Sequence, residues 1–124
     1  MIHLDTSFLI RALVRGSPQD RVLRGWLNEA EPLGISAVAW SEFLCGPVSP
    51  AAVELGGALL GDPVSFEAAD ALLAVRLFNG SGRRRGFLAD CMVAAVAVRC
   101  DASLATANTD DFDRLKGLGP RLVP

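Results

Sequence analysis

The sequence predicts an α/β fold in which helices flank a central, mostly parallel sheet of four or five strands. Short apolar segments of strand character alternate along the chain with longer helical segments, which is the pattern of a parallel sheet covered by helices. Hydrophobic residues make up 51% of the 124 residues, a composition that favours a packed core over disorder. Because this length is close to the commonest domain size, we expect a single domain over residues 1–124.

Five segments have the length and composition of short strands. They cover residues 1–4, 32–36, 64–65, 102–106 and 121–123. In the first of them, His3 is expected to point into the core. Ligands of a parallel sheet bind at the carboxyl ends of the strands, near the point where the strand order reverses. Polar residues that directly follow a strand are therefore the first candidates for a functional site.

Seven segments have helical periodicity or clear helix boundaries. They cover residues 7–14, 19–30, 37–45, 50–60, 66–78, 88–99 and 110–115. Ser36 is a good N-cap and Pro50 suits a first helical position. The segment 88–99 is apolar nearly all round, which indicates a buried helix. In the segment 19–30 the residues expected to face inward are Val22, Leu23, Trp26 and Leu27. The clearest loop is NGSGRRRG, residues 79–86.

Composition and charge argue against several classes of protein. The net charge of −2 argues against a surface that binds any polyanion, although arginine, which suits phosphate, supplies eleven of the twelve basic residues. No apolar run reaches the roughly 18 residues of a membrane span, and the N-terminus lacks the pattern of a signal peptide, so we expect no membrane association. Three cysteines without C-x-x-C spacing favour a reducing cytoplasm over a disulfide framework or a zinc site.

Four acidic positions follow a predicted strand or interrupt an apolar helix, and each has a purely structural alternative. Asp5 could cap the helix after it. Glu42 could lie on an exposed face or in a salt bridge, since an unpaired buried charge is costly. Asp90 could be stabilised by the dipole of its helix. The fourth position is a turn in which Asn108 and Asp111 could form a variant of the capping box.

The four positions together favour a metal site. If the carboxylates converge, their like charges repel, and a cation is needed to keep them ionised. Oxygen ligands select Mg²⁺ or Mn²⁺. Such a site suits phosphoryl chemistry, because the metal orients a phosphodiester and lowers the pKa of an attacking water. His3 is the only histidine, which leaves no Ser-His-Asp triad and no zinc site.

Four segments in this order resemble the PIN domain, in particular the VapC-like toxins of bacterial toxin–antitoxin pairs. They are HLDTSFLI, SAVAWSEF, LADCMVAAVAV and LATANTDDF, and the resemblance extends over nearly the whole chain. It implies a PIN-like sheet flanked by helices and a Mg²⁺- or Mn²⁺-dependent endoribonuclease. It also implies an RNA substrate, a cognate antitoxin protein that holds the nuclease inactive, and a homodimer.

The resemblance also implies roles for particular residues. The family's catalytic and metal-binding carboxylates fall on Asp5, Glu42 and Asp90. Relatives have the fourth acidic residue either at the position of Asn108 or three residues later. Because Asn108 is neutral, we assign the fourth place to Asp111 and expect Asn108 to make a polar or water-mediated contact. The small polar positions that support the cluster match Thr6, Ser7 and Thr106.

Two parts of the chain depart from the family pattern. The segment GSGRRRGFLAD lacks the proline that often precedes the late-helix aspartate in relatives, and residues 46–78 carry no motif. Arg83, Arg84 and Arg85 could contact the RNA backbone or the antitoxin, or simply be solvated. An apolar groove between helices is expected for the antitoxin, with the regions of Phe8 and Trp26 as possible sites.

Two other functions remain open. A different Mg²⁺-dependent α/β phosphohydrolase is one, because HLDTS resembles an aspartate nucleophile at the end of a first strand. That chemistry normally uses a second Asp two residues on, where this chain has Ser7, and a supporting Lys, whereas the only lysine is Lys116. The other is a non-catalytic PIN-like binding module that uses its carboxylates for capping alone. Binding of Mn²⁺ separates the module from the enzymes.

Overall fold

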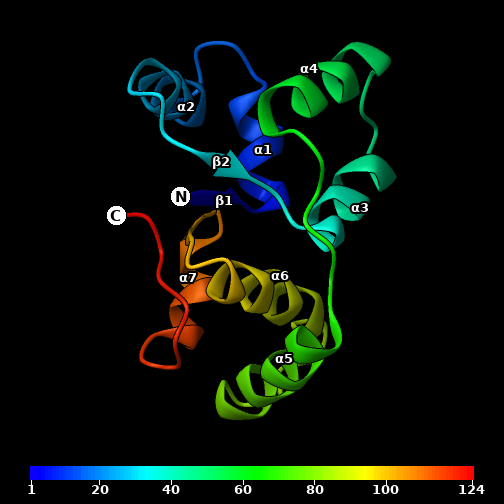
Figure 1. Ribbon diagram of the computed structural model, residues 1–124, viewed down its shortest axis with the longest axis vertical. Helices are drawn as coiled ribbons and strands as arrows, with labels where there is room; N and C mark the ends of the chain where they lie inside the picture. Colours follow the sequence, from blue (N-terminus) through cyan, green and yellow to red (C-terminus); the bar gives the residue numbers. More distant parts are fainter.

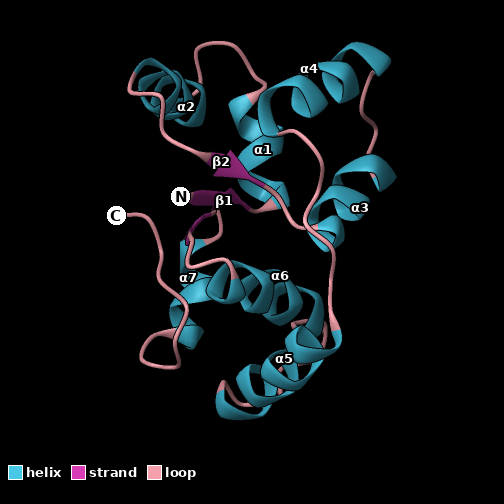
Figure 2. Ribbon diagram, viewed as in Figure 1, coloured by secondary structure: helices cyan, strands magenta, loops and turns pink.

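A three-stranded parallel sheet forms the centre of the computed structural model, which describes residues 1–124 (Figures 1 and 2). The strands are β1 (Ile2–Leu4), β2 (Leu33–Gly34) and β3 (Ser103–Ala105), in the order β2-β1-β3. β1 is central and all of its residues are buried. The residue after β1 therefore lies between the carboxyl ends of two neighbouring strands. The predicted α/β class and parallel sheet are confirmed.

Two of the five predicted strand segments form only single bridges. Val64 pairs in parallel with Ser36 beside β2, and Leu122 pairs with Leu104 of β3 on the side away from β1. A proline precedes each of these segments. Because proline has no backbone N–H to donate to a ladder, regular pairing is short there. The sheet has three full strands rather than four or five, although all five segments lie at predicted positions.

Helices surround this sheet (Figure 1). In that view α1, α2 and α4 lie toward the top, α3 lies to the right of the strands, and α5, α6 and α7 lie toward the bottom. Their bounds are α1 (Thr6–Ala12), α2 (Pro18–Asn28), α3 (Ala37–Cys45), α4 (Pro50–Leu60), α5 (Ala68–Gly80), α6 (Leu88–Arg99) and α7 (Thr109–Phe112), and a 3₁₀ turn follows at Asp113–Leu115. None of these helices reaches the length and hydropathy needed to cross a membrane.

Serine caps fix where three of the helices begin. The side chains of Ser17, Ser36 and Ser49 each accept a hydrogen bond from the backbone N–H three residues later, at 3.0–3.1 Å. These bonds satisfy donors that the first turn of a helix cannot pair internally. The predicted N-cap at Ser36 and the predicted start at Pro50 are both confirmed.

Several predicted helix boundaries differ from the observed ones by one or two residues, and one predicted face was wrong. α1 and α2 each end two residues earlier than predicted. α5 begins at Ala68 rather than at residue 66, because Glu67 and Asp70 form a capping box there. It continues to Gly80, so the first two residues of the predicted 79–86 loop are helical. In α2, Leu23 is buried, whereas Val22 and Leu27 are 44% and 42% exposed, because α2 packs through a narrower stripe than predicted.

The core lies between the sheet and helices α1, α3, α5 and α6. α6 carries a run of small buried residues from Val93 to Ala97, as its apolar sequence predicted. His3 of β1 is only 1% exposed and neither ring nitrogen has a hydrogen-bond partner. Burial, and then the charges of Arg99 and the N-terminus, lower the pKa of His3, so its imidazole is neutral in the core, as expected.

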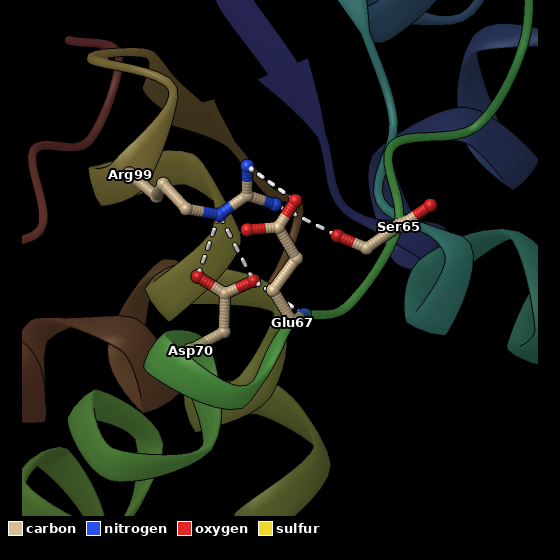
Figure 3. A network of polar contacts seen from close by, with 4 residues as sticks. All are labelled: Ser65, Glu67, Asp70 and Arg99. Atoms are coloured by element: carbon tan, nitrogen blue, oxygen red, sulfur yellow. Dashed lines mark hydrogen bonds and ion pairs between the residues drawn. The ribbon is translucent and has the colours of Figure 1, made fainter.

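A polar network ties the end of α6 to the start of α5 (Figure 3). Arg99 donates through Nε to Asp70 at 2.9 Å and through Nη2 to the carbonyl oxygen of Ser65 at 2.7 Å. Its Nη1 lies 3.5 Å from Oε1 of Glu67. Asp70 is buried, so this pairing satisfies a charge that is costly to leave alone in the interior. The network stands at the end of α6 opposite to Asp90 and has a structural role.

Candidate functional site

Asp5 is the first residue after β1 and lies at the carboxyl edge of the sheet. Its backbone N–H donates to the carbonyl oxygen of Ala105 at 2.9 Å, which continues the pairing between β1 and β3 by one residue. Asp5 occupies the N-cap position of α1, yet its side chain makes no capping hydrogen bond. The capping alternative for this carboxylate is therefore wrong. The side chain is 3% exposed, which is unusual for a group with no cationic partner among the hydrogen bonds.

Two hydroxyl groups hold the Asp5 carboxylate in one orientation. Ser7 Oγ and Thr106 Oγ1 each donate to Asp5 Oδ2 at 2.7 Å. The same hydroxyl oxygens accept hydrogen bonds from the backbone N–H groups of Ala107 and Asn108, at 3.1 and 3.0 Å. Both hydroxyls thus link the carboxylate to the turn after β3. Oδ1 of Asp5 is left without a bond from either of them.

The hydroxyl group of Thr6 does not bind the Asp5 carboxylate. Its Oγ1 donates to the carbonyl oxygen of Ala39 at 2.8 Å, which joins α1 to α3. Of the three small polar residues predicted around the cluster, Ser7 and Thr106 contact Asp5 directly and Thr6 makes no hydrogen bond to it.

Glu42 lies on α3 and its side chain is exposed, as one of its structural alternatives predicted. The charge of Asp5 still affects the pKa of the Glu42 carboxyl group. Partial burial and the negative charge of Asp5 raise the pKa of Glu42, and the Thr6 hydroxyl partly offsets that rise. Glu42 therefore faces Asp5 from the neighbouring helix while remaining open to solvent.

Asp90 lies in the first turn of α6 and is half-buried. Burial raises its pKa to about 7, and the charges of Asp5, Glu42 and Asp111 act in the same direction. The dipole at the N-terminus of α6 favours the ionised form. Burial and the neighbouring negative charges act on Asp90 in the opposite direction. The electrostatic fields of the other three carboxylates all act on Asp90.

Asp111 belongs to the short helix α7, and its Oδ1 accepts a hydrogen bond from Arg84 Nη1 at 2.6 Å. The side chain is 38% exposed. Asn108 is the N-cap residue of α7, but its side chain makes no capping hydrogen bond, so the capping-box alternative is also wrong. Asp110 and Asp113 are exposed.

The three loop arginines have three different environments. Arg83 donates to the side chain of Asn79 and lies over the ring of Phe78, 5.4 Å from its centroid. Arg84 pairs with Asp111, and Arg85 takes part in no ion pair. The Arg84 pairing joins positions 27 residues apart, and no local pattern in the sequence signals it.

The fold thus brings three of the predicted carboxylates, from the end of β1, α3 and α7, within electrostatic reach of Asp90 on α6. No three His, Cys, Asp or Glu side chains lie close enough together to bind one ion as they stand. One of the four carboxylates, Asp111, is paired with Arg84 instead. The arrangement can hold a cation if the side chains turn inward.

An open apolar cavity of about 350 Å³ lies between α1, α2 and α4. Its apolar lining comes from Ala12, Leu13, Leu23, Leu27, Leu55 and Leu59, and Arg15, Asp20 and Arg24 complete it. Phe8 is buried and stacks on Trp26 with ring centroids 5.3 Å apart. The groove expected near Phe8 is therefore filled, and the available cavity lies farther along α1 and α2.

Comparison with proteins of known structure gives the same fold. A complex of VapBC2 from Rickettsia felis bound to promoter DNA contains a chain that is 19% identical to this one, with a TM-score of 0.76 over 99% of this chain and 98% of that chain. A chain of FitAcB from Neisseria gonorrhoeae is 21% identical, with a TM-score of 0.71 over 100% of this chain and 97% of that chain. A chain of a toxin–antitoxin complex from Klebsiella pneumoniae is 22% identical, with a TM-score of 0.76 over 100% of this chain and 97% of that chain.

The comparison with curated proteins finds no match. The family model of the PIN domain matches residues 2–118, which is nearly the whole chain and includes all four carboxylates. This chain belongs to the PIN domain family.

Proposed function

We propose that this protein is the toxin of a toxin–antitoxin pair and a Mg²⁺- or Mn²⁺-dependent endoribonuclease. One observation carries the proposal. The buried Asp5 carboxylate is oriented by Ser7 and Thr106 at the carboxyl end of the central strand, and its charge acts on Asp90 together with those of Glu42 and Asp111 from distant parts of the chain. Structural roles alone leave a buried, oriented and uncompensated carboxylate unexplained.

The donor set fits a hard divalent cation. Asp5, Glu42, Asp90 and Asp111 offer only oxygen ligands, and His3 and the buried Cys91 are directed into the core. Because Ser7 and Thr106 both bind Oδ2 of Asp5, its Oδ1 is free to act as a ligand. Glu42 and Asp111 are exposed enough to rotate toward it.

The residues of this chain then have distinct tasks in RNA hydrolysis. A divalent cation bound here supplies positive charge that offsets the charge of the transition state at phosphorus. Asp5 anchors the site, because its orientation is fixed by two hydrogen bonds. Burial and the other three carboxylates raise the pKa of Asp90 to about 7, so a divalent cation bound among them favours its ionised form and gains it as a ligand. Glu42 and Asp111 complete the negative site from the solvent side.

Cleavage of a structured RNA mixture tests this proposal. We expect the wild-type protein to cut RNA with Mn²⁺ and to lose that activity with EDTA. Asp90→Asn should reduce the rate by more than about 100-fold, since even outer-shell partners of metal ligands typically contribute 10–100-fold. Asp113→Asn is the matched control, because Asp113 is exposed and lies outside the cluster. Equal activity of Asp90→Asn and wild type contradicts the proposed site.

We also propose a protein partner, an antitoxin, that docks an apolar helix in the cavity between α1, α2 and α4. The similar solved structures are toxin–antitoxin complexes, and the cavity offers leucine side chains with Arg15 and Arg24 beside them for acidic residues of the partner. Leu27→Glu should abolish co-purification with the protein encoded by the neighbouring gene. Val22→Glu, on the same helix but outside the cavity, should not. Loss in both variants contradicts this location.

A homodimer in the cytoplasm completes the proposal. Leu72 and Val75 are neighbours on α5 and are 67% and 53% exposed, which favours a second copy as their cover. Leu72→Glu should shift the protein to a monomer in sedimentation equilibrium, and a wild-type monomer contradicts the dimer. The three free cysteines fit a reducing compartment.

The two other functions make different predictions. A phosphohydrolase of another α/β type is disfavoured by membership of the PIN family, and Ser7, where a second carboxylate would stand, donates its hydroxyl to Asp5. A non-catalytic module needs no cation, and an absence of Mn²⁺ binding favours it.

A further inference from the structure

The loop between α5 and α6 is fastened to α7 by two adjacent contacts. At its base Phe87 is buried and its ring meets Phe112 edge-on, with centroids 6.3 Å apart. Three residues earlier, the Arg84 guanidinium meets Asp111, the residue before Phe112. The aromatic contact is a fixed part of the core. The ion pair is half-exposed, with side-chain exposures of 46% and 38%, so it can open without disturbing the core.

Arg84 differs from its two neighbours in what it faces. Arg83 is turned back onto α5 by Phe78 and Asn79, and Arg85 makes no ion pair. Arg84 alone places its positive charge against a carboxylate of the proposed cation site, where its field also reaches Asp90. The site therefore contains a cation supplied by the protein itself.

We propose that Arg84 is a built-in counter-cation that competes with the divalent ion for Asp111 and is drawn away by an RNA phosphate, so that RNA and metal bind cooperatively. This inference rests on the proposed function. A guanidinium binds phosphate as readily as carboxylate, because the same pair of N–H groups can donate to two oxygens of either anion. When a phosphate takes the guanidinium, Asp111 is released to turn toward Asp5 and Asp90. Binding linkage requires the reciprocal effect, in which the divalent ion frees Arg84 and tightens RNA binding.

The size of the effect follows from the exposure of the pair. Exposed ion pairs are worth about 0.2–1 kcal/mol, so loss of Arg84 should tighten Mn²⁺ binding by at most about fivefold. The part of the coupling between Mn²⁺ and RNA that Arg84 carries should have the same size, because the same contact is exchanged in both cases. In Arg84→Gln the coupling should be weaker by that factor.

Titration of Mn²⁺ followed by electron paramagnetic resonance of the free ion tests the inference without measuring activity. The full chain is titrated alone and with a short 2′-O-methyl RNA, and its uncharged methylphosphonate analogue is the control probe. Binding of Mn²⁺ to each probe alone is subtracted, and a gel confirms that the probe stays intact. The variants are Arg84→Gln and, as the matched control from the same loop, Arg85→Gln.

The inference expects the charged probe, but not the neutral one, to tighten Mn²⁺ binding to wild type and to Arg85→Gln. It expects Arg84→Gln to bind Mn²⁺ more tightly than wild type and to respond less to the charged probe than wild type and Arg85→Gln do. Weaker Mn²⁺ binding by Arg84→Gln overturns the competition, because Arg84 then positions Asp111 for the metal. Equal coupling in both variants also overturns it. A wild-type protein that binds no Mn²⁺ contradicts the proposed function itself, which distinguishes the two failures.

Discussion

At the scale of single residues, Asp5 shows how a carboxylate can be prepared for a ligand. It is buried, it does not cap its helix, and both hydroxyls that bind it donate to the same oxygen. The hydroxyls are themselves held by backbone N–H groups of the turn after β3. The orientation of one oxygen atom therefore depends on two segments that are about 100 residues apart.

This dependence predicts that Thr106 matters to the site although it is not a candidate ligand. Thr106→Val keeps the shape of the side chain and removes the donor to Asp5, so RNA cleavage and Mn²⁺ affinity should fall by about 10–100-fold. Thr109→Val is the control, because Thr109 is exposed and its hydroxyl makes no hydrogen bond to Asp5. Similar losses in the two variants contradict the positioning role of Thr106.

Some of these residues were predictable from the sequence and some were not. Asp5 and Asp90 stand out locally, one at a strand end and the other in an apolar helix. The different partners of Ser7 and Thr6 follow from the direction in which α1 leaves the sheet, which the sequence pattern does not encode. The Arg84–Asp111 pair depends on how α7 lies against the preceding loop, and that is a tertiary property.

At the scale of elements, Asp20 organises the corner between α1 and α2. Its carboxylate accepts hydrogen bonds from the Gly16 backbone N–H at 2.9 Å and from Arg24 Nε at 3.0 Å. The Gly16 bond is the main cause of the lowered pKa of Asp20, burial opposes it, and Arg24 adds to the lowering. The folded protein therefore prefers the ionised carboxylate more strongly than the unfolded chain does.

This preference for the ionised carboxylate makes the stability of the folded protein depend on pH. Asp20 contributes stability that is fully present above its ordinary pKa of 3.8 and is lost as the pH falls through the lower folded-state value. Asp20→Asn should lower the Tm at neutral pH, and its difference from wild type should shrink in acid. Thermal unfolding monitored by circular dichroism across this range measures both. Asp62→Asn, at an exposed position without an ion pair, should show no such convergence.

The contact between β1 and β2 constrains Gly34. A Cβ atom at this position would lie 3.0 Å from Cδ2 and 3.1 Å from Nε2 of His3, its register partner. Since the His3 ring is enclosed, Gly34→Ala should lower the free energy of unfolding by about 1–3 kcal/mol. In a His3→Ala background the same substitution should cost much less. Denaturant unfolding of the four proteins measures the difference, and an equal cost in both backgrounds contradicts the clash.

Elements with strong local signals agree best with their sequence. The Ser36 cap and the apolar α6 are set by neighbours within one turn, so pattern alone places them. The edges of the sheet were harder, because the segments at Val64 and Leu122 are too short for regular pairing and take their structure from the strand beside them. The extension of α5 to Gly80 has a similar cause, since Gly80 packs closely against Leu118 from far along the chain.

At the scale of the whole molecule, the order β2-β1-β3 sets where the residues of the proposed site lie. Asp5 follows the central strand and Thr106 follows its neighbour β3, while α3 carries Glu42 and α6 carries Asp90. The charges of Asp5 and Glu42 both act on Asp90. The resemblance predicted this convergence from four short segments. Their sequence spacing carried no information on distance, which only the packing of α3, α6 and α7 supplies.

The central claim is that these four carboxylates form one cation site, and direct binding of Mn²⁺ tests it most directly. Isothermal titration of wild type, Asp5→Asn and Asp113→Asn compares the anchor of the site with an exposed aspartate outside it. The account predicts binding by wild type and Asp113→Asn and a loss of affinity of more than about 100-fold in Asp5→Asn. No Mn²⁺ binding by wild type, or unchanged binding by Asp5→Asn, contradicts it.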